Sequence, residues 1–551
     1  MEKCGRWIDV RLAFALGVLL FASASLPNMA FATMEEDQTP ATQEEINEAL
    51  QLGLLNSAED LPDLYANSDY AVKTIGGANR YETSAKEALY RFPNSHNVII
   101  ASGAGYADSI CAAGLAGALD CPILLTEPGD LSSVAADALR SMGAQNIILL
   151  GSENVASASV EASIRNLVGQ SGTVERVCGP DRYSTQMAVY NYGVQHGLWS
   201  GDTAVVTSAT GFADALSISP ISFALKAPVF YCDESRSLPS AQRAAVQNSG
   251  KTKFLLTGST AVTSENVESY LSGLGSVRRL GGSDRYATSR VINDYAVSNL
   301  GFTWNGVAVT SGSAPYDALG GGSVQGRVKS VLALMEEGDY HYEVSAPFGD
   351  KPTSMIFFGD RSIFSMAFKT KIARSLGFSL SDIEGFRVYI DAGHGGNDSG
   401  AVSGGYVEAD LTRDLAYRVS DRLNSMGIST YVCDNGLGYK LRQHEAFMLD
   451  CGLFVSIHFN ASGGSGTESY IHSYNSAAGS SRLQREIHKR LIAALGLVDR
   501  GMKREAFAVT GGRVPSTLLE IAFIDRPSDM KQYMSRRDQA ASAIAEGVSV
   551  F

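Results

Sequence analysis

The sequence predicts an α/β protein of several domains, in which three tandem repeats precede a separate C-terminal domain. Its 551 residues exceed the roughly 100–200 residues of a usual single domain. The middle of the chain repeats one pattern three times, and short apolar runs alternate with helical stretches. An apolar fraction of 45% with 19% charged residues excludes wholesale disorder. A net charge of −13 argues against a nucleic-acid partner, which would require a basic face.

The first 32 residues have the pattern of an export signal. Basic residues at Lys3, Arg6 and Arg11 precede an apolar run over 12–26, and the small-residue pattern of a cleavage site ends at Ala32. The apolar run is short for a membrane span of about 20 residues, so a cleaved signal is favoured over an uncleaved membrane anchor. We therefore expect a secreted protein with no integral membrane segment in its mature chain. Residues 33–73 are acidic, and we expect them to form a largely flexible spacer.

Three landmarks recur along the middle of the chain with nearly constant spacing. The first is an Arg-Tyr pair whose arginines, Arg80, Arg182 and Arg285, lie 102 and 103 residues apart. The others are an aspartate after an apolar run and a glycine that ends a strand-like run, namely Asp108, Asp214, Asp317, Gly151, Gly258 and Gly359. These landmarks define repeats over 74–170, 171–274 and 275–380. Strands that alternate with helices predict a Rossmann-like parallel sheet in each repeat, with helices on both faces.

These repeats resemble the type 2 cell-wall-binding repeats of secreted bacterial surface proteins, over about residues 74–375. The resemblance implies that the triplet holds the protein non-covalently in the bacterial wall by binding an anionic wall polymer. Arg80, Arg182 and Arg285 could bind that polymer, because a guanidinium pairs well with phosphate or carboxylate. Alternatively, each Arg-Tyr pair packs locally at a helix start. We expect Asp108, Asp214 and Asp317 to cap helix N-termini.

The C-terminal domain, over 386–551, contains the residues suited to catalysis. Two apolar strands deliver His394 and His458 at their ends, and the first turn of a predicted helix between them carries Glu408. Two imidazoles and one carboxylate form a common ligand set of hydrolytic zinc sites. Glu520 interrupts a third apolar strand. Because burying an unpaired carboxylate is costly, such a residue usually has a partner or a function.

This domain resembles the zinc-dependent N-acetylmuramoyl-L-alanine amidases of the third family, in the stretches DAGHGG, YVEADLTRDLA, FVSIHFNAS, DRGMK and PSTLLEIAFI. The resemblance implies a twisted mixed sheet flanked by helices. It also implies that His394, Glu408 and His458 hold Zn²⁺ and that Glu520 is the catalytic carboxylate. The cleaved bond would be the amide between N-acetylmuramic acid and L-Ala of the peptidoglycan stem peptide. Arg500 is a candidate contact for a substrate carboxylate or for Glu520, and a surface role is an equal alternative.

One segment, YVCDNGLGYKLRQHEAFMLDCG, departs from the family pattern and keeps only its LRQ portion. Because this segment borders the cleft, its departure concerns the substrate subsites. It removes none of the expected metal ligands. The combined interpretation is an exported peptidoglycan hydrolase attached to the cell wall by its repeats. Two alternatives remain open at this point: a surface-layer or adhesin protein with a degenerate amidase domain, and a zinc peptidase acting on peptidoglycan peptide bonds.

Overall fold

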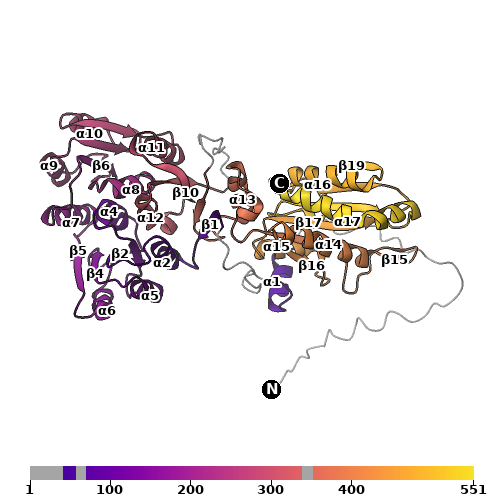
Figure 1. Ribbon diagram of the computed structural model, residues 1–551. Helices are drawn as coiled ribbons and strands as arrows, with labels where there is room; N and C mark the ends of the chain where they lie inside the picture. Colours follow the sequence, from indigo (N-terminus) through magenta and orange to yellow (C-terminus); the bar gives the residue numbers. More distant parts are fainter. Residues whose placement is uncertain (1–40, 57–69, 338–351) are drawn as a thin grey trace, which may run out of the picture.

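The structure is a computed structural model that describes residues 41–56, 70–337 and 352–551. The repeat region and the C-terminal domain form two bodies joined at a packed junction (Figure 1). The predicted export signal lies outside the described residues. Within the described ranges, none of the helices combines the length and apolarity needed to cross a bilayer.

Each repeat region sheet has four parallel strands, as the alternating pattern predicts. The first runs in the order β3 (Ile123–Thr126), β2 (Asn97–Ser102), β4 (Asn146–Leu150) and β5 (Thr173–Val177). The second runs β7 (Val229–Cys232), β6 (Thr203–Ser208), β8 (Lys253–Thr257) and β9 (Ser276–Leu280). The third runs β11 (Ser330–Met335), β10 (Thr303–Ser311), β12 (Met355–Phe358) and β1 (Val72–Ile75).

In each sheet, one edge strand lies outside the sequence repeat that supplies the other three strands. Strand β5 lies beyond residue 170 and completes the first sheet, and β9 lies beyond residue 274 and completes the second. The third sheet takes β1, from the start of the repeat region, whose Val72 pairs with Met355. This exchange covers a sheet edge that would otherwise expose unpaired backbone groups. It also closes the three modules into a ring, so no module is complete without its neighbour.

Helices surround these sheets and meet at the centre of the ring. They are α2 (Arg80–Arg91), α3 (Ala107–Cys111), α4 (Ala113–Leu119), α5 (Ser133–Met142), α6 (Ala158–Val168), α7 (Arg182–Gln195), α8 (Ala213–Leu225), α9 (Ser240–Asn248), α10 (Glu265–Ser272), α11 (Arg285–Leu300), η3 (Pro315–Ala318), α12 (Gly321–Arg327) and α13 (Met366–Ser375). The equivalent helices α4, α8 and α12 contact one another. Small residues permit this close approach.

The prediction that Asp108, Asp214 and Asp317 cap helices is wrong. Each lies inside the first turn of its helix, and those helices begin without a side-chain cap. Burial raises the pKa of Asp108 and of Asp214 to about 6, although an arginine from the next repeat opposes the shift in each case. Side-chain caps are found on three other helices, α2, α7 and α11. There Asn79, Asp181 and Asp284, each one residue before a repeat arginine, accept hydrogen bonds from backbone N–H groups of the first turn.

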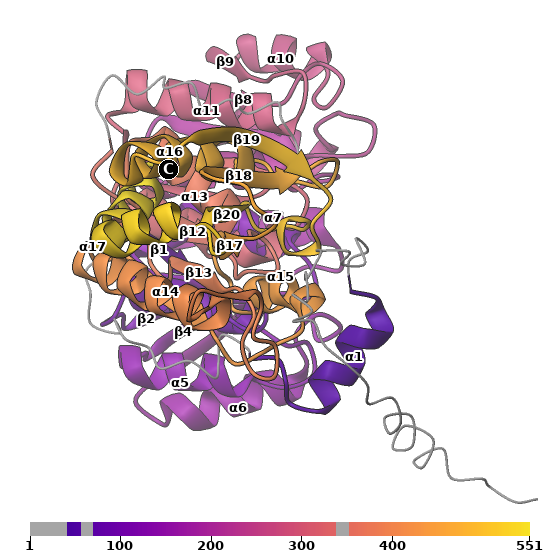
Figure 2. The same ribbon diagram turned by 90° about the vertical axis from the view of Figure 1, so that its right-hand side faces the viewer.

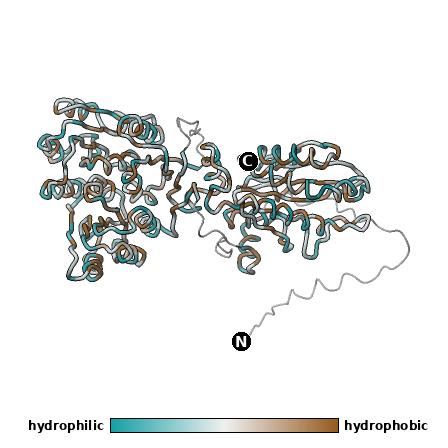
Figure 3. The backbone as a smooth tube through the Cα atoms, in the orientation of Figure 1, coloured by the Kyte–Doolittle hydropathy of each residue, from teal (hydrophilic) through white to brown (hydrophobic). Residues whose placement is uncertain are grey.

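The C-terminal domain has a six-stranded mixed sheet in the order β16-β13-β17-β20-β18-β19. Its strands are β13 (Arg387–Ala392), β16 (Ser429–Cys433), β17 (Leu453–Asn460), β18 (Thr467–His472), β19 (Asp499–Glu505) and β20 (Ser516–Phe523). Its helices are α14 (Glu408–Ser425), α15 (Tyr439–Met448), α16 (Ser480–Leu495), η5 (Ala508–Thr510) and α17 (Pro527–Ser549), with a hairpin of β14 (Val402–Ser403) and β15 (Tyr406–Val407). The expected mixed sheet flanked by helices is confirmed, and apolar residues concentrate along its strands (Figure 3).

Part of the expected flexible spacer is folded. Residues 43–51 form α1 (Gln43–Gln51), which starts with a capping box between Thr42 and Glu45. Ala49 and Leu55 join an apolar cluster of the C-terminal domain, so this segment lies against the C-terminal domain (Figure 2 shows α1 near α15). The chain therefore contacts the C-terminal domain before it enters the repeats and returns to that domain afterwards.

The return from the repeats to the C-terminal domain is also ordered. After η4 (Leu380–Asp382), Ile383 pairs with Val72 beside β1, and the amide of Glu384 donates to the Val72 carbonyl. Ile383 and Phe386 are both buried. The connection is thus an extension of the third sheet, which fixes the chain up to the start of β13.

The central helix contact predicts a steric test. A Cβ atom on Gly114 of α4 would lie 1.9 Å from the carbonyl oxygen of Ala227. Alanine has the higher helix propensity, so any loss on substitution measures the clash. We expect Gly114→Ala to destabilise the repeat region by about 1–3 kcal/mol, measured by thermal unfolding. Gly129→Ala, where a Cβ meets nothing within 4 Å, serves as the control; equal unfolding temperatures of both variants would contradict the close packing.

Candidate active site

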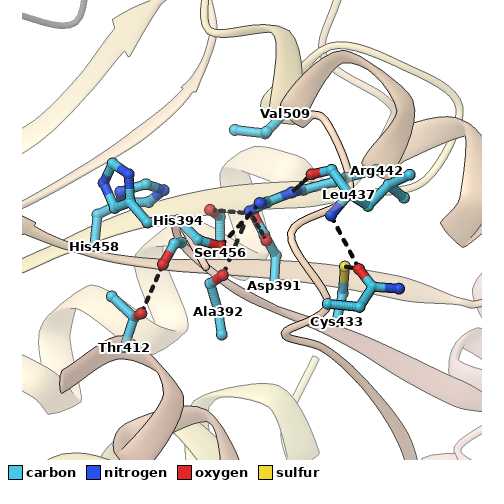
Figure 4. Close-up of polar contacts among 12 residues, drawn as sticks. Asp391, Ala392, His394, Thr412, Cys433, Leu437, Arg442, Ser456, His458 and Val509 are labelled. Atoms are coloured by element: carbon cyan, nitrogen blue, oxygen red, sulfur yellow. Dashed lines mark hydrogen bonds and ion pairs between the residues drawn. The ribbon is translucent and has the colours of Figure 1, made fainter. Parts of the chain in front are cut away.

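The first histidine of the site follows β13 in a tight turn. His394 has a φ of +68°, a conformation that costs energy for a residue with a Cβ. Two contacts hold this turn: Thr412 Oγ1 donates to the Gly393 carbonyl at 2.7 Å, and Arg442 Nη2 donates to the His394 carbonyl at 3.1 Å. The turn leaves the His394 ring 4.9 Å from the His458 ring, centroid to centroid (Figure 4).

Glu408 joins the two histidines. It is the first residue of α14, and its Oε1 lies 3.1 Å from His394 Nε2 and 3.2 Å from His458 Nδ1. The Phe459 amide also donates to Oε1 and the Ala401 amide to Oε2, both at 2.9 Å. One potential ligand atom from each of His394, Glu408 and His458 lies within 4.8 Å of the others. The three residues that the sequence nominated therefore converge.

The electrostatics of this cluster favour a positive charge. Burial alone would raise the pKa of Glu408, but hydrogen bonds and charge from both histidines lower it below its usual range. Burial alone would lower the pKa of His394, but the carboxylates of Glu408 and Asp398 raise it to about 9. Two imidazole nitrogens and a carboxylate oxygen also match the ligand types and number of a hydrolytic zinc site. The residues present thus fit a zinc ion.

Glu520 lies beside this cluster on β20, opposite His458 in the paired strands β17 and β20. Its side chain is 5% exposed, and its Oε2 atom has no hydrogen-bond partner among the described residues. Burial, then the charges of Glu408 and Glu468, raise the pKa of Glu520 well above its usual range. A buried carboxyl kept from local donors is suited to accept and return a proton.

Arg500 contacts neither Glu520 nor a metal ligand. Its Nε donates to Glu468 Oε2 at 2.8 Å, and Lys503 also pairs with that carboxylate. Asn460 Nδ2 and the Tyr470 hydroxyl donate to the other oxygen, Oε1, at 2.7 and 2.9 Å. Of the alternatives considered for Arg500, the contact with Glu520 is not formed, because Glu468 stands opposite Glu520 on β18 and pairs with the arginine. Sequence reasoning missed Glu468, because its strand, TESYIH, is largely polar and a carboxylate does not stand out in it.

The segment that departs from the family pattern supplies a buried ion pair. Arg442 of α15 pairs with Asp391 at the end of β13, and Ser456 Oγ donates to the same carboxylate at 2.7 Å (Figure 4). Arg442 Nε also donates to the Leu437 carbonyl at 2.8 Å. Arg442 therefore fixes both the His394 turn and the loop before α15. That loop lines the catalytic pocket of about 150 Å³ together with both histidines and Val509.

The N-terminal segment supports the same helix. Glu445 of α15 is fully buried, and Asn56 donates to its Oε1 through the backbone amide at 3.2 Å and through Nδ2 at 2.9 Å. Tyr389 donates to the other oxygen at 2.6 Å. A residue of the expected spacer thus satisfies a buried carboxylate in the C-terminal domain.

The repeat arginines do not meet at one point. Arg80 donates to the Gly103 carbonyl at 2.7 Å, Arg182 to the Ala209 carbonyl at 2.8 Å, and Arg285 to the Gly312 carbonyl. Each guanidinium also lies over an aromatic ring of another repeat, namely Tyr316 at 3.7 Å, Tyr106 at 5.7 Å and Phe212 at 5.5 Å respectively. Three equivalent positions therefore lie where the repeats meet, and the local contacts expected as an alternative are present.

Comparisons with known proteins give the family. The family model described as N-acetylmuramoyl-L-alanine amidase matches residues 388–550, and the model described as Cell wall binding domain 2 (CWB2) matches residues 74–161 and 176–268. N-acetylmuramoyl-L-alanine amidase LytC of Bacillus subtilis (strain 168) is 30% identical over 492 residues, which are 88% of this chain and 95% of LytC. The chain belongs to the N-acetylmuramoyl-L-alanine amidase family. Both resemblances drawn from the sequence are confirmed.

Two solved structures also match this amidase. Cwp6 from Clostridium difficile covers 92% of this chain and 85% of its own, at 22% identity and a TM-score of 0.49. The catalytic domain of CwlV from Bacillus (Paenibacillus) polymyxa var. colistinus is 30% identical and covers 29% of this chain and 95% of its own, with a TM-score of 0.28.

The Asn56 contact predicts a stability effect far from the catalytic pocket. Asn56→Ala removes the 2.9 Å side-chain hydrogen bond to buried Glu445 and leaves the backbone one, and a hydrogen bond to a charged group contributes about 1.5–3 kcal/mol. We expect the C-terminal domain of the variant to unfold at a lower temperature in differential scanning calorimetry. Asn47→Ala, at an exposed position of α1, is the matched control. A melting temperature equal to that of the control would show that the Asn56 side chain does not stabilise this domain.

Proposed function

We propose that this amidase is a secreted, zinc-dependent N-acetylmuramoyl-L-alanine amidase that cleaves the amide between N-acetylmuramic acid and L-Ala of the peptidoglycan stem peptide. One observation carries the proposal: His394, Glu408 and His458 converge within 4.8 Å beside the buried, unpartnered Oε2 of Glu520. The wall-binding repeats and the family support peptidoglycan as substrate.

The proposed mechanism assigns a role to each residue. His394, Glu408 and His458 would hold Zn²⁺, which polarises a carbonyl and acidifies water in sites of this kind. Glu520 takes the proton from the attacking water and passes it to the nitrogen of L-Ala as the amide breaks. Arg442 is a positioning residue, because it fixes the His394 turn through the carbonyl of that residue. Glu468 keeps Arg500 and Lys503 paired beside Glu520.

The repeats would attach the enzyme non-covalently to the bacterial wall by binding an anionic polymer. Arg80, Arg182 and Arg285 support this because each lies at a junction between repeats beside an aromatic ring. A guanidinium that donates one N–H group to a backbone carbonyl still has other N–H donors, which can bind a phosphate or carboxylate. Such attachment needs a local positive patch, which a net charge of −13 does not prevent.

The catalytic assignment is tested by Glu520→Gln. The substitution keeps the size of the side chain and removes its ability to accept the proton, so we expect release of free stem peptides to fall by about 10²-fold or more. Zinc content, measured by atomic absorption, should stay at the parent level. Glu546→Gln, an exposed position on α17, is the control.

Mass spectrometry of digested muropeptides identifies the cleaved bond. Free stem peptides with intact glycan chains support the proposal, whereas cut stem peptides would indicate a zinc peptidase. A purified chain that contains no zinc and releases nothing would indicate a wall-binding protein without catalysis. Full activity of Glu520→Gln would overturn the role of that residue.

The attachment is tested with the triple variant Arg80→Gln, Arg182→Gln and Arg285→Gln. We expect it to bind purified cell walls several-fold more weakly than the parent in a sedimentation assay. Binding by the parent should weaken as NaCl rises from about 0.1 M to about 1 M, because the Debye length falls from roughly 10 Å to roughly 3 Å. The control, Arg140→Gln, Arg243→Gln and Arg290→Gln, makes the same change in charge at exposed positions elsewhere. Binding that is insensitive to salt would contradict an electrostatic attachment.

A further inference from the structure

A cavity of about 840 Å³ lies between the third repeat and the C-terminal domain, apart from the catalytic pocket. On the repeat side it is lined by α13 and the loop before it. On the amidase side it is lined by Phe447 at the end of α15, by Gly479 and Arg482 at the start of α16, and by Phe551. The C-terminus lies at this junction, next to α13 (Figure 1).

Four arginines line this cavity: Arg361, Arg374, Arg482 and Arg513. Their guanidinium groups contact backbone carbonyls and aromatic rings. Arg361 donates to the Met448 carbonyl, and Arg374 and Arg482 both donate to the Val550 carbonyl, at 3.2 and 3.3 Å. Arg482 also lies over Phe551 at 5.6 Å, and Arg513 lies over Phe447 at 5.1 Å.

Within the described ranges, none of these four guanidinium groups forms an ion pair with a carboxylate. The two glutamates in the lining accept hydrogen bonds from serines: Glu337 accepts from the amide and hydroxyl of Ser365, which also lines the cavity, and Glu336 accepts from the Ser313 hydroxyl. This cluster is unusual in a chain with 58 acidic and 45 basic residues. Two carboxylates line the same cavity and the charge of Asp382 acts on Arg374, but within the described ranges none comes within ion-pair distance of these arginines.

The arginines also lie close enough to oppose one another. Burial, then the charge of Arg482, lowers the pKa of Arg374 below its usual range. The Nε atom of Arg374 is buried and has no acceptor among the described residues. A shared anion would relieve this repulsion and could supply acceptors to several guanidinium groups.

We propose that this cavity is a binding site for an anionic glycan segment that carries phosphate or carboxylate groups. The volume lies within the range of about 300–1,000 Å³ typical of ligand sites. The arginines provide the charge, and Phe368, Phe447 and Phe551 provide apolar surface for sugar rings. The proposal rests on the proposed function in one respect, namely that the protein acts on the bacterial wall, where such glycans occur.

The position of the site would link attachment to catalysis. Helix α15 carries Phe447 at the cavity and Arg442 at the catalytic turn. Gln443 of the same helix donates to the carbonyl of Val509, which lines the catalytic pocket, and Gly512 nearby lines the cavity. A glycan bound between the two bodies would therefore contact the elements that shape the catalytic pocket.

Arginine modification tests the site at the level of single residues. The full-length secreted chain is treated with phenylglyoxal, and modification of each arginine is measured by peptide mass spectrometry with and without a ligand. The two ligands are sodium tripolyphosphate, for the phosphate groups of a wall glycan, and trigalacturonate, for carboxylate groups carried on sugar rings. We expect one of them to slow modification of Arg482 and Arg513 at least fivefold, while exposed Arg140 and Arg290 react unchanged. The protecting ligand identifies the source.

Calorimetric titration with the protecting ligand gives the second measurement. Arg482→Gln with Arg513→Gln should lose one class of binding site or weaken it at least tenfold, whereas Arg140→Gln with Arg290→Gln should match the parent. Protection that persists in the Arg80, Arg182 and Arg285 triple variant and in Glu520→Gln supports this site independently of the proposed function. Equal modification with and without both ligands, or unchanged binding by the Arg482 and Arg513 variant, would overturn the proposal.

Discussion

The buried carboxylate of Glu408 is the constraint on which the catalytic domain depends. It lies between two imidazoles and accepts two backbone N–H groups, so the ends of β13 and β17 and the start of α14 must meet around it. Burial of a charge is tolerated only where partners replace water. The strained turn at His394, the Thr412 contact and the Arg442 contact all maintain that arrangement. The same arrangement leaves Glu520 buried beside the cluster without a local donor.

The second organising feature is the path of the chain between its two bodies. The chain contacts the C-terminal domain through α1 and Asn56, enters the ring of repeats through β1, and returns by an extension of the third sheet at Ile383. Each of these connections is satisfied by burial or by backbone hydrogen bonds. The arrangement places the third repeat against the catalytic domain and creates the arginine-lined cavity between them. The repeat region and the catalytic domain are thereby connected by packed contacts as well as by the chain that runs between them.

Local sequence patterns were sufficient to place some of the site residues and insufficient for others. His394, Glu408 and His458 were predictable because parallel strands deliver the residues at their carboxyl ends to one edge of a sheet. Glu520 was predictable because a carboxylate within an apolar strand must have a partner or a function. Asp108, Asp214 and Asp317 were misassigned as caps, because position after a strand does not distinguish an N-cap from the first turn of the helix. The pairing of Arg500 with Glu468 was not predicted, because Glu468 comes from a neighbouring strand that the sequence does not align with it.

By itself, the sequence determined the composition of this protein: an α/β chain with three homologous repeats, a C-terminal domain of the amidase family, and the three residues of a cluster suited to hold a metal ion. These features are encoded in local periodicity and in motifs of fixed spacing, which need no knowledge of distant contacts. Only the tertiary structure decided that β1 closes the third sheet, that Asn56 satisfies Glu445, and that four arginines surround one cavity. Each of these joins residues far apart in the chain, and the energy that brings them together arises from burial and pairing in the folded protein.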